Sequence, residues 1–168
     1  MPSQGFNLGE EGHVAFLELG AFDIDTAGHA GTVINMENWS HITYIIRMEA
    51  TVRAASVVTV QSCSAMGGGG TNTAIAFGYY MTAIASTTAL GDVLGARTEV
   101  TVAATGIVPA TGTDNIMYVI DLDDTQLVSG DVGFRLVIAD PGAGALATIL
   151  CILSGGRYQS PQSVTVIN

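Results

Sequence analysis

Apolar and polar residues alternate along most of the chain with a period of two. This period is typical of β-strands that have one face against a core. It is clearest between residues 37 and 48, in the sequence ENWSHITYIIRM. There one face carries Ile42, Tyr44, Ile46 and Met48, and the other carries Thr43, Ile45 and Arg47. The pattern predicts a half-buried strand.

The same alternation recurs downstream in short runs rich in β-branched and aromatic residues. The residues expected to share the core-facing side are Val58 and Val60; Ile75, Phe77, Tyr79 and Met81; Val100 and Val102; Ile116, Tyr118 and Ile120; Phe134, Leu136 and Ile138; and Leu146, Thr148, Leu150 and Ile152. Further strands are expected at 13–19, near 32–34 and at 163–167.

Turn-forming residues separate these runs, at 67–70, 91–92, 109–115, 130–131 and 141–144. Helical periodicity is almost absent: 81–95 is expected to be a loop, and 121–130 a loop with one helical turn at most. The sequence therefore predicts an all-β, jelly-roll-like β-sandwich of about eight to ten strands. We expect residues 13–168 to form this single domain, preceded by an N-terminal arm at 1–12.

Charge narrows the choice of partners. The net charge is −10, and all five basic residues are arginines. Such a field repels phosphate, so we expect no nucleic-acid binding. Without lysine the chain has no P-loop lysine, no Schiff base and no lysine general base.

Only 12% of the residues are charged, against roughly 25% in a typical soluble domain. Two explanations stay open. Small polar side chains cover the surface, or part of the surface is covered by a partner.

The cysteines and the first residues give expectations about redox state and membranes. Cys63 and Cys151 lie in or beside apolar strand-like runs without CxxC spacing, which favours two reduced buried thiols over a disulfide. No stretch is apolar enough to cross a membrane, and the first twelve residues do not resemble a cleaved signal peptide. We therefore expect no membrane association.

Two acidic clusters resemble metal-binding sequences. Asp23, Asp25 and His29 are spaced D-x-D-x3-H, but ordinary turn chemistry explains them better, because no fourth ligand can be placed. Asp121, Asp123 and Asp124 lack the glycine and glutamate of a calcium-binding EF-hand loop, so acidic capping of one helical turn is favoured. We expect no metal and no cofactor.

Nucleophilic catalysis is not supported by the sequence. It would need a Ser, Cys or Thr beside a histidine oriented by a carboxylate, and no serine lies in a G-x-S-x-G elbow. His13, His29 and His41 all lie in the first quarter of the chain. The glycine tract at 67–70 lacks the lysine of a phosphate-binding loop. We expect no catalytic residues and no enzymatic activity.

Two aromatic residues are candidate interface anchors, Phe6 in the arm and Trp39 at the start of a strand. For Trp39 the favoured alternative is a plug that closes one end of the sandwich.

Several blocks of sequence together resemble the jelly-roll decoration, or cement, proteins of tailed bacteriophage capsids. These blocks are NMENWSHITYIIRMEA at 35–50, IMYVIDLDDTQL at 116–127, VGFRLVIAD at 132–140 and LSGGRYQSP at 153–161. The resemblance covers the chain from about residue 20 onward. It implies a virion protein, made in the host cytoplasm, that docks in many copies on the outer surface of the capsid. Its partners would be the major capsid protein and its own copies, as a dimer or trimer.

The leading hypothesis is therefore a viral structural protein that stabilises contacts between major capsid subunits. The alternative is a receptor- or glycan-binding sandwich, such as a fibre head or lectin-like module, because one fold hosts many functions. A cupin-like enzyme is a third possibility, and it would need histidine and carboxylate metal ligands inside the barrel.

Overall fold

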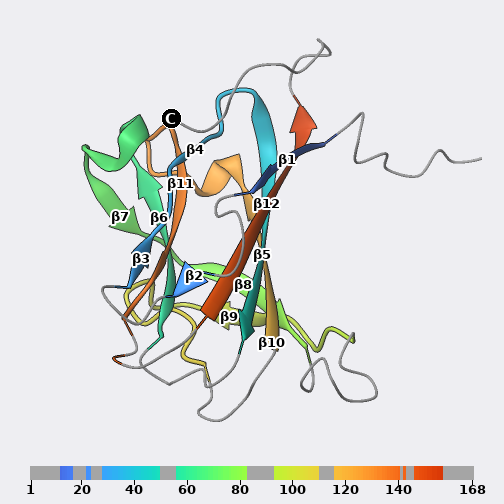
Figure 1. Ribbon diagram of the computed structural model, residues 1–168. Coiled ribbons are helices and arrows are strands. Elements are labelled where there is room, and N and C mark those ends of the chain that lie inside the picture. Colours follow the sequence, from blue (N-terminus) through green and yellow to red (C-terminus); the bar gives the residue numbers. More distant parts are fainter. Residues whose placement is uncertain are drawn as a thin grey trace, which may run out of the picture.

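Two antiparallel β-sheets face each other in the computed structural model (Figure 1). The model describes residues 12–16, 22–23, 28–49, 56–82, 93–109, 116–140, 142 and 146–156. The prediction of an all-β sandwich is confirmed. Among the described residues the helical elements are two single 3₁₀ turns, η1 (Met66–Gly68) and η2 (Asp124–Gln126), and no helix is long and apolar enough to cross a membrane.

The larger sheet, called sheet A here, has seven strands within the described residues. Its order is β1 (His13–Phe16), β12 (Leu146–Gly156), β5 (Trp39–Glu49), β10 (Ile116–Asp123), β8 (Phe77–Met81) and β9 (Thr98–Val100), and β2 (Phe22–Asp23) also pairs with β12. The smaller sheet, sheet B, has five strands in the same part of the chain. Its order is β3 (His29–Ala30), β11 (Gly133–Ile138), β6 (Val58–Cys63) and β7 (Asn72–Ala74), and β4 (Ile34–Asn35) also pairs with β11.

The strand order is that of a jelly roll. The chain passes from β5 in sheet A to β6 in sheet B, and from β10 in sheet A through β11 in sheet B back to β12. Four adjacent strands of sheet A, β1-β12-β5-β10, and the four strands β3-β11-β6-β7 of sheet B thus have the order of the two sheets of a jelly roll, which is built from two Greek keys. The fold places β5, with β12 and β10 on either side, in the middle of sheet A.

The core lies between the sheets and follows the alternation. On β5 the buried side chains are Ile42, Tyr44, Ile46 and Met48, as predicted, and Tyr44 donates a hydrogen bond of 3.3 Å to the Phe134 carbonyl of sheet B. Trp39 is 4% exposed and belongs to the same core cluster, which agrees with its interpretation as a plug. Cys63 and Cys151 are free and buried, so the expected reduced thiols are confirmed.

On β12 the predicted core face is wrong. The buried residues are Ala147, Ile149, Cys151 and Leu153, whereas Leu146, Thr148, Leu150 and Ile152 are half-buried or exposed. Both sets are largely apolar, so the alternation in this run does not tell the two faces apart.

The predicted strand positions are met with small shifts in length. The run expected at 75–81 contains β8, while β7 ends before it at Ala74, and the short strand expected near 32–34 is β4 at Ile34–Asn35. Two residues expected on the core side, Met81 at the end of β8 and Val102 after β9, are exposed. Of the loop expected at 121–130, the first three residues instead continue strand β10, and the expected helical turn is η2. The Gln126 Oε1 accepts a hydrogen bond of 3.0 Å from the Asp123 N–H. The strand expected at 163–167 and most of the arm at 1–12 lie outside the described residues.

Candidate functional site: the outer face of sheet A

A straight row of four apolar side chains crosses the outer face of sheet A. The pairing register puts Ile45 opposite Leu150 on one side and Val119 on the other, and Val119 opposite Tyr80. All four are half-buried, and Leu150, Ile45 and Val119 alternate with core residues along their strands. We call Leu150, Ile45, Val119 and Tyr80 the apolar row. Ile152 and Met117 lie one step to either side of it and enlarge the patch.

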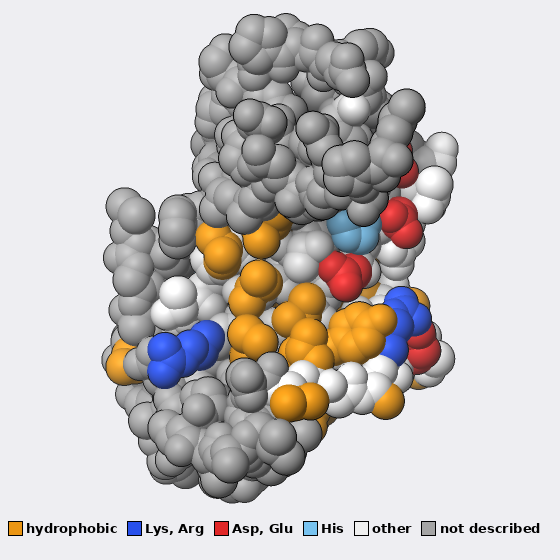
Figure 2. Space-filling model, turned by 90° about the vertical axis from the view of Figure 1, so that its right-hand side faces the viewer, with side chains coloured by type: hydrophobic (Ala, Val, Ile, Leu, Met, Phe, Trp, Pro, Cys, Tyr) orange, Lys and Arg blue, Asp and Glu red, His pale blue; other side chains and the backbone are white. Residues whose placement is uncertain are grey.

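This patch departs from the usual surface of an antiparallel sheet. One face of such a sheet commonly packs on the core while the other carries polar side chains toward water. In sheet A the middle of the outer face is hydrophobic, and charged side chains gather at its sides (Figure 2). Contiguous apolar surface of this kind marks places where proteins bind one another.

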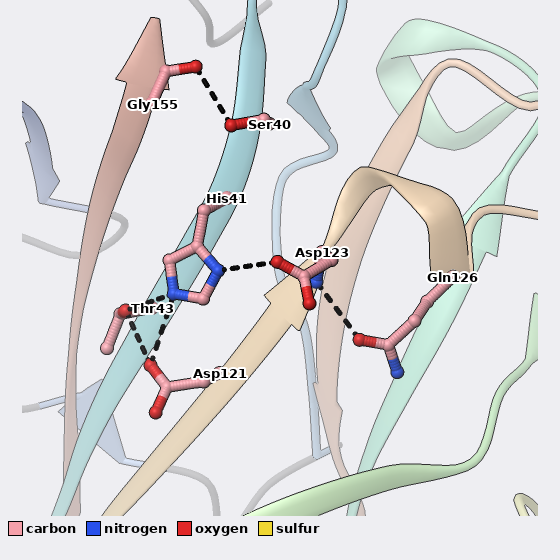
Figure 3. A network of polar contacts seen from close by, with 7 residues as sticks. All are labelled: Ser40, His41, Thr43, Asp121, Asp123, Gln126 and Gly155. Carbon is pink, nitrogen blue, oxygen red and sulfur yellow. Dashed lines mark hydrogen bonds and ion pairs between the residues drawn. The ribbon is translucent and has the colours of Figure 1, made fainter.

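A polar network borders the apolar row at one end of β5 and β10 (Figure 3). The Thr43 hydroxyl donates a hydrogen bond of 2.6 Å to Asp121 Oδ1, and the His41 ring lies between two carboxylates. His41 Nδ1 is 3.0 Å from Asp123 Oδ1, and His41 Nε2 is 3.5 Å from Asp121 Oδ1. Cross-strand pairing produces this arrangement, because Asp123 is opposite His41 and Asp121 is opposite Thr43.

The geometry of the network is not that of a metal site. The two ring nitrogens of His41 point in opposite directions, each toward its own aspartate, so the ligand atoms do not converge on one point (Figure 3). Among the described residues no group of three or more His, Cys, Asp or Glu side chains is placed to hold a metal ion. The network instead fixes a negative, hydrogen-bonded border for the apolar row.

Positive charge lies at two other places on this face. Arg47 is exposed on β5, two residues beyond Ile45 and on the side away from His41. Arg97 forms an ion pair with Glu99 and covers Gly78, where a Cβ would collide with the guanidinium. Arg47 therefore lies on the side of the apolar row away from Asp121 and Asp123, whereas Arg97 lies on the same side as Asp121, because Gly78 pairs with Asp121.

A pocket of about 380 Å³ opens elsewhere, where β4 and the β4–β5 turn approach the β10–β11 connection. Its lining includes apolar Met36, Met66 and Leu127, and three carboxylates, Glu37, Asp124 and Asp131. The carboxylates oppose any anionic ligand there.

The residues considered from sequence as metal or catalytic groups are scattered by the fold. His41 joins Asp121 and Asp123, but Asp124 turns away into η2 and lines the pocket. His29 lies on β3 of sheet B, Asp23 on β2 of sheet A, and Asp25 lies outside the described residues. The side chain of His13 is also outside them.

The two candidate anchors have different positions. Trp39 is enclosed by the core and leaves little surface for a partner, so the structure favours the plug. Phe6 lies outside the described residues, and its role as an anchor stays a prediction.

The apolar row was not found from the sequence as a site. One signal was present: Ile45 is an apolar residue on the polar side of an otherwise regular alternation. Ile45 becomes part of a larger patch only together with Val119, Tyr80 and Leu150, which come from distant parts of the chain.

Comparison with known proteins adds the following findings. No protein-family model matches the chain, and no curated protein matches it. Its structure resembles the crystal structure of the SPBc2 prophage-derived protein YomS, with a TM-score of 0.43 and 12% identity, over 86% of this chain and 94% of that one. A likeness at this TM-score carries no argument about family or function.

Proposed function

We propose that this protein is a structural subunit of a phage virion, a decoration protein that docks on the outer surface of the head and stabilises contacts between major capsid subunits. The observation that carries the proposal is the apolar row, a protein-binding surface on a sheet whose other face already packs on the core, which suits a subunit that assembles with other virion subunits, its own copies included. The resemblance in sequence to decoration proteins supports the same function.

The balance of charge suits this role. A subunit with a net charge of −10 is repelled by packaged nucleic acid and remains on the outside of the shell. Its low content of charged residues reduces the desolvation cost of contacts with neighbouring proteins. Each contact can be weak, because copies held on one lattice present a high effective concentration to one another.

The test is cosedimentation of the purified full chain with expanded shells assembled from the major capsid protein of the same genome. We expect saturable binding in a fixed ratio to capsid subunits, and a higher melting temperature for decorated shells. Shells of an unrelated phage are the control. A protein that stays in the supernatant with its own shells at every concentration contradicts the proposal. Saturable binding to a glycan, without binding to shells, would support the receptor-binding alternative instead.

A further inference from the structure

We propose that two copies of this chain pair face to face through the outer faces of their A sheets, around a two-fold axis that runs along the apolar row. This inference rests on the proposed function, because the pairing is proposed for copies assembled on a capsid. It deepens that function by naming a second copy as the partner that covers this face.

Charged groups lie on both sides of the apolar row, at matching positions along the strands. The apolar row lies at the level of Ile45. Two residues away toward one strand end lie Thr43 and Asp121, which are paired with each other. Two residues away toward the other end lie Arg47 and Met117, which are also paired. Arg97 also lies on the Asp121 side, over Gly78, but it is paired with Glu99, so Asp121 and Asp123 leave that side net negative. Arg47 lies on the other side of the row, at the same distance along the strands as Asp121.

A two-fold axis along the row uses this arrangement. Rotation about such an axis brings the apolar rows of the two copies into contact. It also exchanges the two sides of the row, so the strand positions of Arg47 and Met117 in one copy face those of Thr43 and Asp121 in the other. Asp121 is one strand away from Thr43, a spacing of roughly 4.8 Å that a long arginine side chain can reach. The contact occurs twice, once on each side of the axis. Arg47 already interacts within its own chain, and a guanidinium has N–H donors for more than one acceptor.

The other orientation of the axis is disfavoured. An axis parallel to the strands would place each position along the strands opposite the same position in the other copy. The Asp121 carboxylates of the two copies would then approach each other. Like charges brought together out of water repel strongly. Electrostatics therefore selects the axis along the row.

The size of the patch limits its strength. The row spans three strand spacings, roughly 14 Å, which is small beside the roughly 800 Å² per partner of a standard interface. We therefore expect reversible pairing at micromolar concentrations in solution, strengthened when copies are held on a lattice.

The test is sedimentation of the full chain over a concentration series at about 0.15 M salt, where long-range repulsion between the acidic copies is screened. We expect a monomer–dimer equilibrium. Val119→Thr keeps a β-branched side chain and should weaken pairing at least tenfold. The matched control is Val108→Thr, at a valine that is 58% exposed beside Ile107, which bridges Val58 of sheet B. The control should pair like the unaltered chain.

A charge exchange tests the orientation. Arg47→Glu and Asp121→Arg should each weaken pairing, and an equimolar mixture of the two variants should restore it, because both contacts then join opposite charges. Circular dichroism and thermal melting check that each variant folds. If Asp121→Arg does not fold, Asp121→Asn replaces it: it should weaken pairing by itself, and its mixture with Arg47→Glu restores one of the two contacts. A mixture that pairs no better than the single variants overturns the proposed axis.

The remaining outcomes separate this inference from the proposed function. If the unaltered chain stays monomeric and Val119→Thr loses binding to shells, the face belongs to the capsid, so the inference is wrong while the decoration function stands. If the chain pairs as described but ignores its own shells, the decoration function is wrong and the paired interface stands. Val119→Thr that pairs as strongly as the unaltered chain overturns the inference directly.

Discussion

Ser62 and Asp131 form a short hydrogen bond between sheet B and the β10–β11 connection. The Ser62 hydroxyl donates to Asp131 Oδ2 at 2.5 Å and accepts from the Val128 N–H at 3.0 Å. Ser62 is fully buried on β6, while Val128 and Asp131 belong to the connection that returns the chain to β11. One hydroxyl thus fixes both the connection and a carboxylate that lines the pocket.

Ser62→Ala should destabilise the protein by about 1–3 kcal/mol, because it leaves a backbone N–H and a carboxylate without their partner. Urea denaturation measures the loss. The control is Ser64→Ala, at an exposed serine whose hydroxyl accepts one hydrogen bond of 2.9 Å from the Thr71 N–H. Water can replace that bond, so the control should lose well under half as much. Equal losses would show that the buried hydroxyl has no special role.

Gly133→Ala should be among the more damaging small substitutions. Gly133 is buried on β11 opposite Asn35, and an added Cβ would collide with the Ile34 carbonyl oxygen on β4. Because the obstacle is backbone within the sheet, we expect a loss of about 1–3 kcal/mol in the free energy of unfolding. Thermal melting with circular dichroism measures it.

Gly69→Ala is the matched control for Gly133→Ala. Gly69 has an ordinary φ of −79°, and nothing lies within 4 Å of an added Cβ. Its melting temperature should stay within the error of the measurement. If Gly133→Ala melts at the same temperature as this control, β4 does not pack as described.

Stability should fall steeply in alkali. Burial raises the pKa of Tyr118 to about 12, with a smaller contribution from Tyr79. Burial also raises the pKa of Tyr44 and of the Cys151 thiol. These groups are neutral when folded and ionise more easily when unfolded. Their contribution is complete below about pH 9, the ordinary thiol pKa, and is lost as the pH rises toward their folded pKa values.

Urea denaturation between pH 7 and pH 11 tests this dependence. The free energy of unfolding should be level from pH 7 to about pH 8.5 and then decrease. Tyr118→Phe removes one of the ionising groups, so its curve should fall less steeply above pH 10. Unchanged stability up to pH 11 would mean that these side chains are hydrated in the folded protein.

Neither thiol should react in the native state. Cys63 and Cys151 are both completely buried, and burial raises the pKa of each, so little thiolate is present or accessible at pH 8. A colorimetric disulfide reagent should detect no reactive thiol in the native protein and two thiols per chain after unfolding in urea. Rapid reaction of either cysteine without urea would contradict the burial of that strand.

The sequence was informative where one face of a strand is apolar and the other is polar. On β5 the alternation identified the core residues from Ile42 to Met48 correctly, and the acidic turn after Asp121 was placed at η2. On β12 the same method chose the wrong face, because Leu150 and Ile152 are as apolar as Ile149 and Leu153. Periodicity locates a strand but cannot orient one that is apolar on both faces.

The site could not be predicted for a related reason. Alternation assigns Ile45 and Val119 to the outer faces of their own strands, but it contains no information on register between strands. That the two stand side by side, with Leu150 and Tyr80 in line, follows from pairings across distant segments. Jelly-roll pairings are set by the packing of the whole sandwich, which no local pattern encodes.

The central place of β5 has a consequence for how the chain folds. β5 ends at Glu49, yet its two neighbours, β10 and β12, begin only at Ile116 and Leu146. While the chain is being synthesised, β5 therefore emerges with both edges unpaired and with apolar side chains on both faces. Contacts between such distant segments form slowly, and waiting strands of this kind are exposed to pairing with other unfinished chains. Arg47, an exposed charged side chain on the outer face of β5, discourages such pairing while β5 waits for its neighbours.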